Sequence, residues 1–178
     1  STGFTGAVTL ADGNIVTNNL TSSLGEGVLT VIKDAVIGAE GLNFSTRLEG
    51  RVKNRIRADA GVKLTFGRAN GTTYLAGAVE AENVNIGIVG GSQTMWVYLE
   101  NDLVVSGALL VADGDRLYVG NGGTTGAIMR TTSSTSQDLN VDLSGASSQL
   151  YFNRSDSVTY SGVISNSGSV VKTGNGTV

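Results

Sequence analysis

The side chains of this chain that could do chemistry are few, because the sequence contains neither cysteine nor histidine. Missing cysteine excludes disulfides, thiolate nucleophiles and thiolate metal sites. Missing histidine removes the commonest general base near neutral pH and the commonest transition-metal ligand. Carboxylates, Tyr, Lys and Ser are left for catalysis. We therefore predict a protein that is not an enzyme and that binds no metal and no cofactor.

The most concentrated charge is a basic run near residue 50. Arg51, Lys53, Arg55 and Arg57 occupy alternate positions, with Arg47 just before them. Alternate residues of a strand share one face, so the run predicts one strand face that carries four cations. Such a face could bind sulfated glycans or the phosphates of lipopolysaccharide. The alternative is a solvated outer face that discourages pairing between sheets.

An aromatic pair, Trp96 and Tyr98, alternates with the aliphatic residues Val97 and Leu99. If the aliphatic set fills the core, the two rings stand together on the outside, as in surfaces that stack on sugars or contact a partner. The alternative is a wider interior that contains both rings. We favour the exposed arrangement because Glu100 continues the same face.

Acidic residues give weaker candidates. Asp12-Gly13-Asn14 and Asp113-Gly114-Asp115 could donate oxygens to calcium, but both are also ordinary turn tripeptides, which we favour. Glycan cleavage would need clustered carboxylates. Neighbouring turns of a coil would bring Glu80 near Asp102 and Asp138 near Asp115, and such pairs also arise by chance.

The composition indicates strands and turns. There are 26 Gly, no Pro and only 15% charged residues, with a net charge of -3. Glycine, Asn, Ser and Thr favour turns, and Val and Ile favour strands. The acidic balance argues against nucleic acid as a partner. The apolar fraction, 40%, argues against disorder.

Short apolar alternations recur along the chain at a spacing of about 22 residues, which predicts a parallel β-helix or β-solenoid of about eight rungs. We treat residues 1–178 as one such domain. An ordinary β-sandwich is the alternative. The first series of repeated segments is Leu42–Phe44, Leu64–Phe66, Ile86–Ile88 and Leu109–Val111, and the second runs through Val52, Leu75, Val97, Leu117 and Leu139.

The last nineteen residues, Tyr160–Val178, resemble the autotransporter-associated β-strand repeat of passenger domains. The positions in register with that repeat are Gly162, Ile164, Gly168, Lys172, Gly174, Gly176 and Thr177. The departures are Asn166 at a usual Gly position, and Val170 and Val178 at usual Leu positions.

The resemblance implies a right-handed solenoid that is exported and displayed at the cell surface, with an outer-membrane barrel encoded downstream of this segment. The chain would then be a fragment of a longer passenger that works as an adhesin or stalk, with surface glycans or further copies of itself as partners. Two alternatives are a self-assembling subunit of an extracellular filament, sheath or surface layer, and a phage-tail or secreted glycan-processing β-helix.

Overall fold

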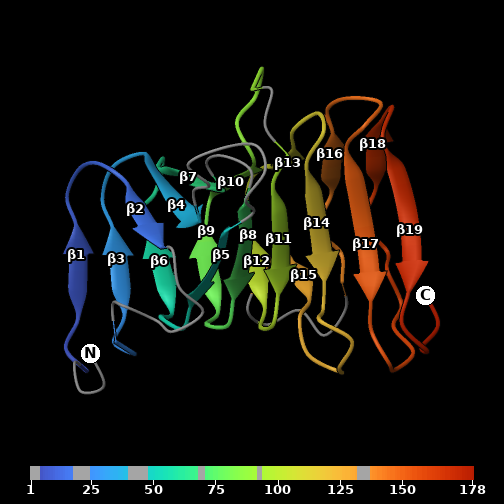
Figure 1. Cartoon of the computed structure of the whole chain (residues 1–178), viewed down its shortest axis with the longest axis horizontal. Helices are drawn as coiled ribbons and strands as arrows, with labels where there is room; N and C mark the ends of the chain where they lie inside the picture. The colour runs from blue at the N-terminus through green and yellow to red at the C-terminus, as the bar shows by residue number, and fades with distance from the viewer. Residues whose placement is uncertain (1–4, 18–24, 40–47, 68–70, 92–93, 132–136) are drawn as a thin grey trace.

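The computed structural model describes residues 5–17, 25–39, 48–67, 71–91, 94–131 and 137–178. Within these ranges the chain is all-β, and its strands form three parallel sheets that stack into a β-solenoid of about six turns, about 24 residues apart. The predicted solenoid is therefore confirmed. Figure 1 shows the rod from the side, with the two termini at opposite ends.

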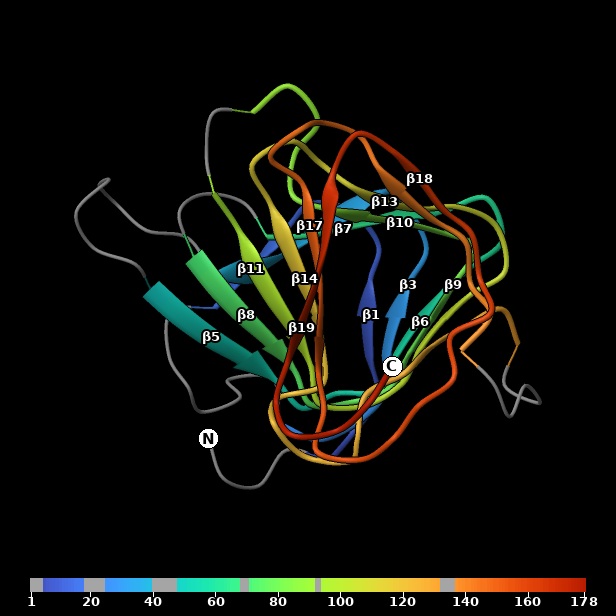
Figure 2. The ribbon, with the colours of Figure 1, turned by 90° about the vertical axis from the view of Figure 1, so that its right-hand side faces the viewer.

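Within the described residues, all but the first and last turns contribute one strand to each sheet, so the rod has three sides when viewed along its axis (Figure 2). In spatial order, sheet 1 consists of β1 (Val8–Leu10), β3 (Leu29–Val31), β6 (Ile56–Ala58), β9 (Val79–Ala81), β12 (Leu103–Val105) and β15 (Ile128–Met129). Sheet 2 consists of β2 (Ile15–Thr17), β4 (Ala35–Ala39), β7 (Lys63–Phe66), β10 (Asn83–Ile86), β13 (Leu109–Val111), β16 (Val141–Leu143) and β18 (Ile164–Asn166). Sheet 3 consists of β5 (Leu48–Val52), β8 (Gly71–Leu75), β11 (Trp96–Leu99), β14 (Arg116–Val119), β17 (Gln149–Asn153) and β19 (Ser169–Thr173).

The predicted spacing and number of turns need correction, because the turns differ in length. Leu99 pairs with Val119, 20 residues later, whereas Val119 pairs with Phe152, 33 residues later. The insertions lie in loops between strands and leave the stacking of the strands unchanged. A single average period of 22 therefore overestimates the number of turns.

The predicted register is also partly wrong. In the first series, Ile86 stacks on Phe66 and Val111, two residues away from the predicted partners in each case. In the second series, Val52 pairs with Leu75 and Val97 with Leu117, but the other steps do not align. Leu42–Phe44 lies outside the described residues. The two series mark only two of the three sides of the coil.

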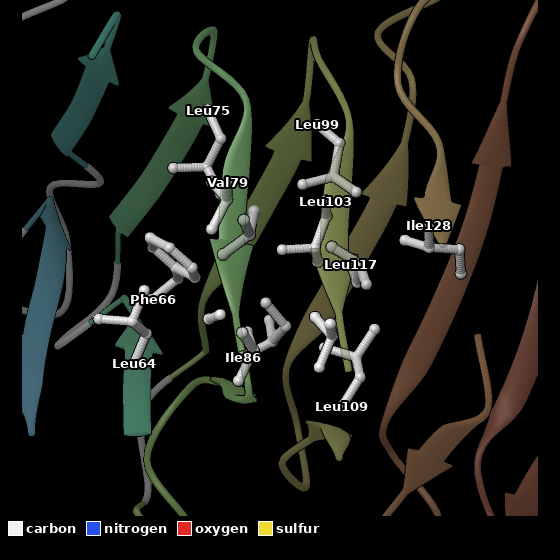
Figure 3. Packing of buried hydrophobic residues seen from close by; sticks show 14 of the residues in the cluster. Leu64, Phe66, Leu75, Val79, Ile86, Leu99, Leu103, Leu109, Leu117 and Ile128 are labelled. Carbon is white, nitrogen blue, oxygen red and sulfur yellow. The ribbon is translucent and has the colours of Figure 1, made fainter. Parts of the chain in front are cut away.

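The core is a set of aliphatic columns, because alternate residues of each strand point inward and stack on their counterparts in the next turn. Figure 3 shows residues of these columns, which point from the different sheets into the interior of the coil. Their members are fully or almost fully buried, and include Leu64, Phe66 and Ile86 in sheet 2, Val79, Leu103 and Ile128 in sheet 1, and Leu75, Leu99 and Leu117 in sheet 3. No strand could bury its apolar face alone, so neighbouring turns stabilise one another.

Several corners between strands require glycine, because they lie directly against the backbone of the preceding turn. A Cβ atom on Gly77 would stand 2.0 Å from the carbonyl oxygen of Asn54, whereas one on Gly123 would meet nothing within 4 Å. We expect Gly77→Ala to lower the free energy of unfolding by about 2–3 kcal/mol, as forced overpacking does. The matched control, Gly123→Ala, should change it by less than about 0.5 kcal/mol. Urea unfolding followed by circular dichroism measures both, and equal losses would contradict this account of the corners.

Candidate contact surface

The outer face of sheet 3 carries a ladder of four tyrosines in consecutive turns. Tyr74, Tyr98, Tyr118 and Tyr151 occupy the same register position on β8, β11, β14 and β17. Their ring centroids are 5.0, 4.1 and 4.3 Å apart in that order, with interplanar angles of 21°, 11° and 18°. We call these four residues the tyrosine ladder. Its rings stack because parallel in-register strands lie about 4.8 Å apart, close to the distance between the centroids of offset-stacked aromatic rings.

A second row of outward side chains runs beside the ladder. Trp96 and Arg116 are direct neighbours on β11 and β14, and the Arg116 guanidinium carbon lies 4.9 Å from the Trp96 ring and 5.9 Å from the Tyr151 ring. Both distances are within the range of cation–π attraction. Among the described residues, no carboxylate forms an ion pair with Arg116. Within the described part of the chain, ring contacts and not an ion pair therefore hold the Arg116 guanidinium in place.

An ion pair lies at the Tyr74 end of the tyrosine ladder. The guanidinium of Arg51 donates two hydrogen bonds to the carboxylate of Glu100, one of them from Nη2 to Oε1 at 2.8 Å. Arg51 also lies 5.4 Å from the centroid of the Tyr74 ring. Asn121 Nδ2 donates a further hydrogen bond of 3.0 Å to Glu100. Glu100 thus links its own turn to the turn of β5, two turns before it, and to the turn of β14, which is the next one.

The structure places Trp96 and Tyr98 on the outer face of the coil, while Val97 and Leu99 are fully buried. Stacking of a sugar on Tyr98, however, would need a free ring face. Tyr74 and Tyr118 cover the two faces of Tyr98, because their strands flank β11 on opposite sides. The ladder therefore presents ring edges and hydroxyl groups outward.

The basic run is divided between two sheets, so the prediction of one strand with four cations is wrong. Arg51 lies on β5, Lys53 lies in the corner that follows, and Arg57 lies on β6. Each cation has an acidic neighbour: Lys53 Nζ is 3.5 Å from Glu26, and Arg55 and Arg57 both pair with Glu80. Arg47 lies outside the described residues. These pairs neutralise much of the positive field of the run.

The two Asp-Gly tripeptides form turns, as the sequence predicts. Gly13 and Gly114 both have positive φ, 89° and 82°. Asp12 accepts a 2.8 Å hydrogen bond from the amide of Gly13, and the Lys33 ammonium beside it lowers its pKa. No group of three or more potential metal ligands occurs among the described residues. Both tripeptides have the geometry of a turn, and their side chains also bond to neighbouring turns, since Asn14 accepts from the amide of Val36 and Asp113 from the amide of Ser147.

Asp115 is the exception among the acids, because it is only 1% exposed. Its carboxylate accepts a 2.6 Å hydrogen bond from the amide of Met95, and the other oxygen lies against Gly87. Burial raises the pKa of Asp115 to about 7, and the hydrogen bond from Met95 only partly opposes this shift. Gly87 follows β10 directly and Met95 directly precedes β11, so the two residues mark the ends of the loop between these strands. Asp115 therefore joins the two ends of this loop.

In the predicted pairs of carboxylates, Glu80, Asp115 and Asp138 each have other partners. Glu80 stacks on Val104 in the next turn, in place of Asp102, and is engaged by Arg55 and Arg57. Asp138 accepts a 3.0 Å hydrogen bond from the amide of Arg130. A shallow groove over sheet 1 is lined in part by Asp59, Glu80 and Glu82. There the amide of Gly61 donates to Glu82 at 2.8 Å, so two of the three acids already have partners.

The residues of the C-terminal repeat motif occupy close contacts between turns. Gly162 and Gly176 lie on the backbone of the preceding turn, where a Cβ atom would stand 2.2 and 1.8 Å from carbonyl oxygens. Asn166, at a usual glycine position, has a φ of 71°, a conformation that Asn tolerates better than most residues. Ile164 stacks on Val141, and Gly168 lies against Leu143. Lys172 donates a hydrogen bond to the carbonyl of Gly174, a residue with positive φ. The carbonyl of Thr177 accepts a hydrogen bond from the amide of Val158.

Four members of this surface were not identified from the sequence: Tyr74, Arg116, Tyr118 and Tyr151. A local signal for the tyrosines exists, because each tyrosine of the ladder precedes a large apolar residue, and three of the four also follow one. The exception is Tyr74, which follows the polar residue Thr73. Unequal turn lengths hide this signal from a search for a fixed period.

No protein-family model matches this chain, and neither the curated proteins nor the solved structures contain a significant match to it. Within the described residues, no helix is long and apolar enough to cross a membrane. The fold and the surface define a three-sided parallel β-solenoid with an aromatic outer face on sheet 3. The resemblance of residues 160–178 to a passenger repeat stays a prediction from the sequence.

Proposed function

We propose that this chain is part of a secreted, cell-surface β-solenoid that acts by contact and performs no catalysis, as an adhesin or stalk of the passenger kind. The solenoid supplies a rigid rod, and the repeat-like segment 160–178 supplies the link to exported passengers. The absence of cysteine suits export in an unfolded state, since no disulfide can form too early.

The observation that carries the proposal is the outer face of sheet 3, where Trp96, Arg116 and the tyrosine ladder gather on one side of the rod. Tyrosine, tryptophan and arginine are the residues most enriched at the energetic centres of binding surfaces. Their side chains are already ordered by stacking, so little conformational entropy is lost when a partner binds.

The chemistry of this face favours an acidic glycan as the partner. Arg116 forms no ion pair within the described residues, although the whole chain has a net charge of -3. A guanidinium binds carboxylate or sulfate groups through two parallel hydrogen bonds. The row of tyrosine hydroxyls offers donors and acceptors to sugar hydroxyl groups along the same line.

Binding of the purified chain to heparin, polygalacturonate and dextran, measured by isothermal titration calorimetry, tests this proposal. We expect binding to at least one acidic polymer and none to dextran. Arg116→Met should weaken binding roughly tenfold, a loss of about 1.4 kcal/mol. The control Lys63→Met, an exposed residue on sheet 2, should leave the affinity unchanged because it lies on another side of the rod. Equal weakening by both variants would indicate nonspecific attraction and refute the contact face.

Two further measurements separate the alternatives. Long fibres in electron micrographs of the purified chain would favour the self-assembling subunit over the adhesin or stalk. Release of reducing sugar from the same polymers would favour a glycan-processing β-helix, and the Glu80 side of the rod would then need to be reconsidered.

A further inference from the structure

We propose that the tyrosine ladder is a site of oxidative cross-linking, at which a one-electron oxidant of the peroxidase and hydrogen peroxide class joins tyrosines of neighbouring turns through carbon–carbon bonds. This inference is independent of whether sheet 3 binds a glycan. It rests on the geometry and accessibility of the ladder.

The first step of the argument is proximity. Tyr98, Tyr118 and Tyr151 are stacked with centroids 4.1 and 4.3 Å apart and nearly parallel rings. Each sits at the same register position of its strand, so the three phenol rings project in the same direction from adjacent backbones. The ring carbons next to the hydroxyl-bearing carbon of two neighbours are therefore held close together, which replaces a bimolecular encounter of radicals with an intramolecular one.

The second step is access. The ladder lies on the outer face of the rod, and Tyr74, Tyr98 and Tyr151 are half-buried, whereas Tyr118 is 8% exposed. An oxidant can thus reach rings on both sides of Tyr118, and electron transfer along the stack can carry the oxidation to it. Trp96 lies 6.3 Å from the Tyr118 ring, farther than either tyrosine neighbour.

The third step is the balance of the reaction. Each of two tyrosines loses one electron to the oxidant and its hydroxyl proton to solvent, which gives two phenoxyl radicals. The radicals couple at the ring carbons beside the hydroxyl-bearing carbon, and the hydrogen atoms on those carbons move to the oxygens to restore two phenols. One hydrogen peroxide accepts the two electrons and two protons and becomes two water molecules. The protein loses two hydrogen atoms for each bond formed.

The fifth tyrosine provides an internal control. Tyr160 packs against Phe152, with ring centroids 5.3 Å apart in an edge-on arrangement, and donates its hydroxyl hydrogen to the carbonyl of Leu139. Burial raises the pKa of Tyr160 to about 12. It has no tyrosine ring stacked on it among the described residues, so we expect it to stay outside the cross-links.

The experiment treats the purified chain with horseradish peroxidase and hydrogen peroxide at several protein concentrations. The monomer should gain dityrosine fluorescence and lose about 2 Da per cross-link, with a yield that does not depend on protein concentration. Trypsin cleaves after Arg68, Arg116, Arg130 and Arg154, so it places Tyr118, Tyr151 and Tyr160 in three separate peptides, 117–130, 131–154 and 155–172. Mass spectrometry should find peptide 117–130 joined to 69–116 or to 131–154.

Two tyrosine variants test whether stacking in the ladder determines which cross-links form. Tyr118→Phe keeps an aromatic ring in the ladder but cannot form a phenoxyl radical, and it separates Tyr98 from Tyr151. We expect it to abolish both cross-links between peptides and to leave only the Tyr74–Tyr98 pair, whose rings are 5.0 Å apart. Tyr160→Phe should leave the product unchanged. The proposal is overturned if the folded wild type forms only intermolecular links, links through Tyr160, or singly oxidised products without dityrosine.

Cross-linking has a structural consequence that supplies a second readout. A bond between Tyr98 and Tyr118 closes a loop of 20 residues and fixes β11 against β14, which restricts the unfolded chain. The cross-linked monomer should therefore unfold at a higher urea concentration than the untreated monomer. An unchanged or lower midpoint in a sample with the mapped cross-link would contradict a bond formed while β11 and β14 keep their native pairing.

Discussion

Replacing Arg154 with Met should lower the free energy of unfolding by about 3 kcal/mol, because it breaks a buried network that joins two turns. Arg154 is only 7% exposed. Its Nε and Nη2 donate to the two oxygens of Asp156 at 2.8 and 2.7 Å, and its guanidinium also donates to the carbonyls of Thr124 and Gly126. The substitution would leave the buried carbonyl of Gly126 without this donor, and an unsatisfied buried polar group costs about 1–3 kcal/mol.

The matched control is Arg116→Met, which removes the same functional group from the outer face of sheet 3. Arg116 contacts rings and no carboxylate among the described residues, so its loss should cost about 1 kcal/mol or less. Urea unfolding monitored by circular dichroism, with the slope of the transition compared between variants, measures both changes. Equal losses would mean that the bonds of Arg154 add nothing beyond a surface contact.

The class of fold could be predicted from the sequence because the coil repeats the same local chemistry in each turn. Alternating apolar residues such as Leu64 and Phe66 mark the inward side of a strand, and glycines mark the corners. The number of turns could not be predicted, since the 33-residue step from Val119 to Phe152 places its extra residues in loops. Loop length costs little free energy, so the sequence need not keep a constant period.

The contact surface was predictable only within single strands. Trp96 and Tyr98 share a strand, and alternation alone placed them on one face. Tyr118 and Tyr151 join them through strand pairing across unequal turns, which depends on register. The prediction of one strand face with four cations was wrong for a related reason. The alternation of basic residues continues through the corner at Lys53, where the chain passes from sheet 3 to sheet 1. Pairing between turns, which places Glu80 beside Arg57, is equally invisible in a single sequence.

The second large effect concerns pH and the buried carboxyl group of Asp115. In the unfolded chain this group should lose its proton near pH 3.8, whereas in the folded chain burial raises its pKa to about 7. Between these two values the folded state binds more protons than the unfolded state. Stability therefore falls as the pH rises from about 4 to about 7, and the contribution of this group is constant above that range.

The size of the effect follows from the shift. Each unit of difference in pKa corresponds to about 1.4 kcal/mol, so Asp115 should lower the free energy of unfolding by up to about 4 kcal/mol between pH 4 and pH 8. Asp12 and Asp156 act in the opposite sense, since Lys33 and Arg154 respectively hold their pKa values below the usual range. Their contributions are lost only as the pH falls below about 4 and are the same in wild type and in an Asp115 variant.

Asp115→Asn isolates this group. Asparagine keeps an oxygen that can accept the hydrogen bond from the amide of Met95, and it carries no charge. We expect urea midpoints of variant and wild type to be similar at pH 4 and to diverge as the pH rises, with the variant more stable at pH 8. Parallel pH profiles would mean that the carboxyl group is ionised at little cost in the folded chain.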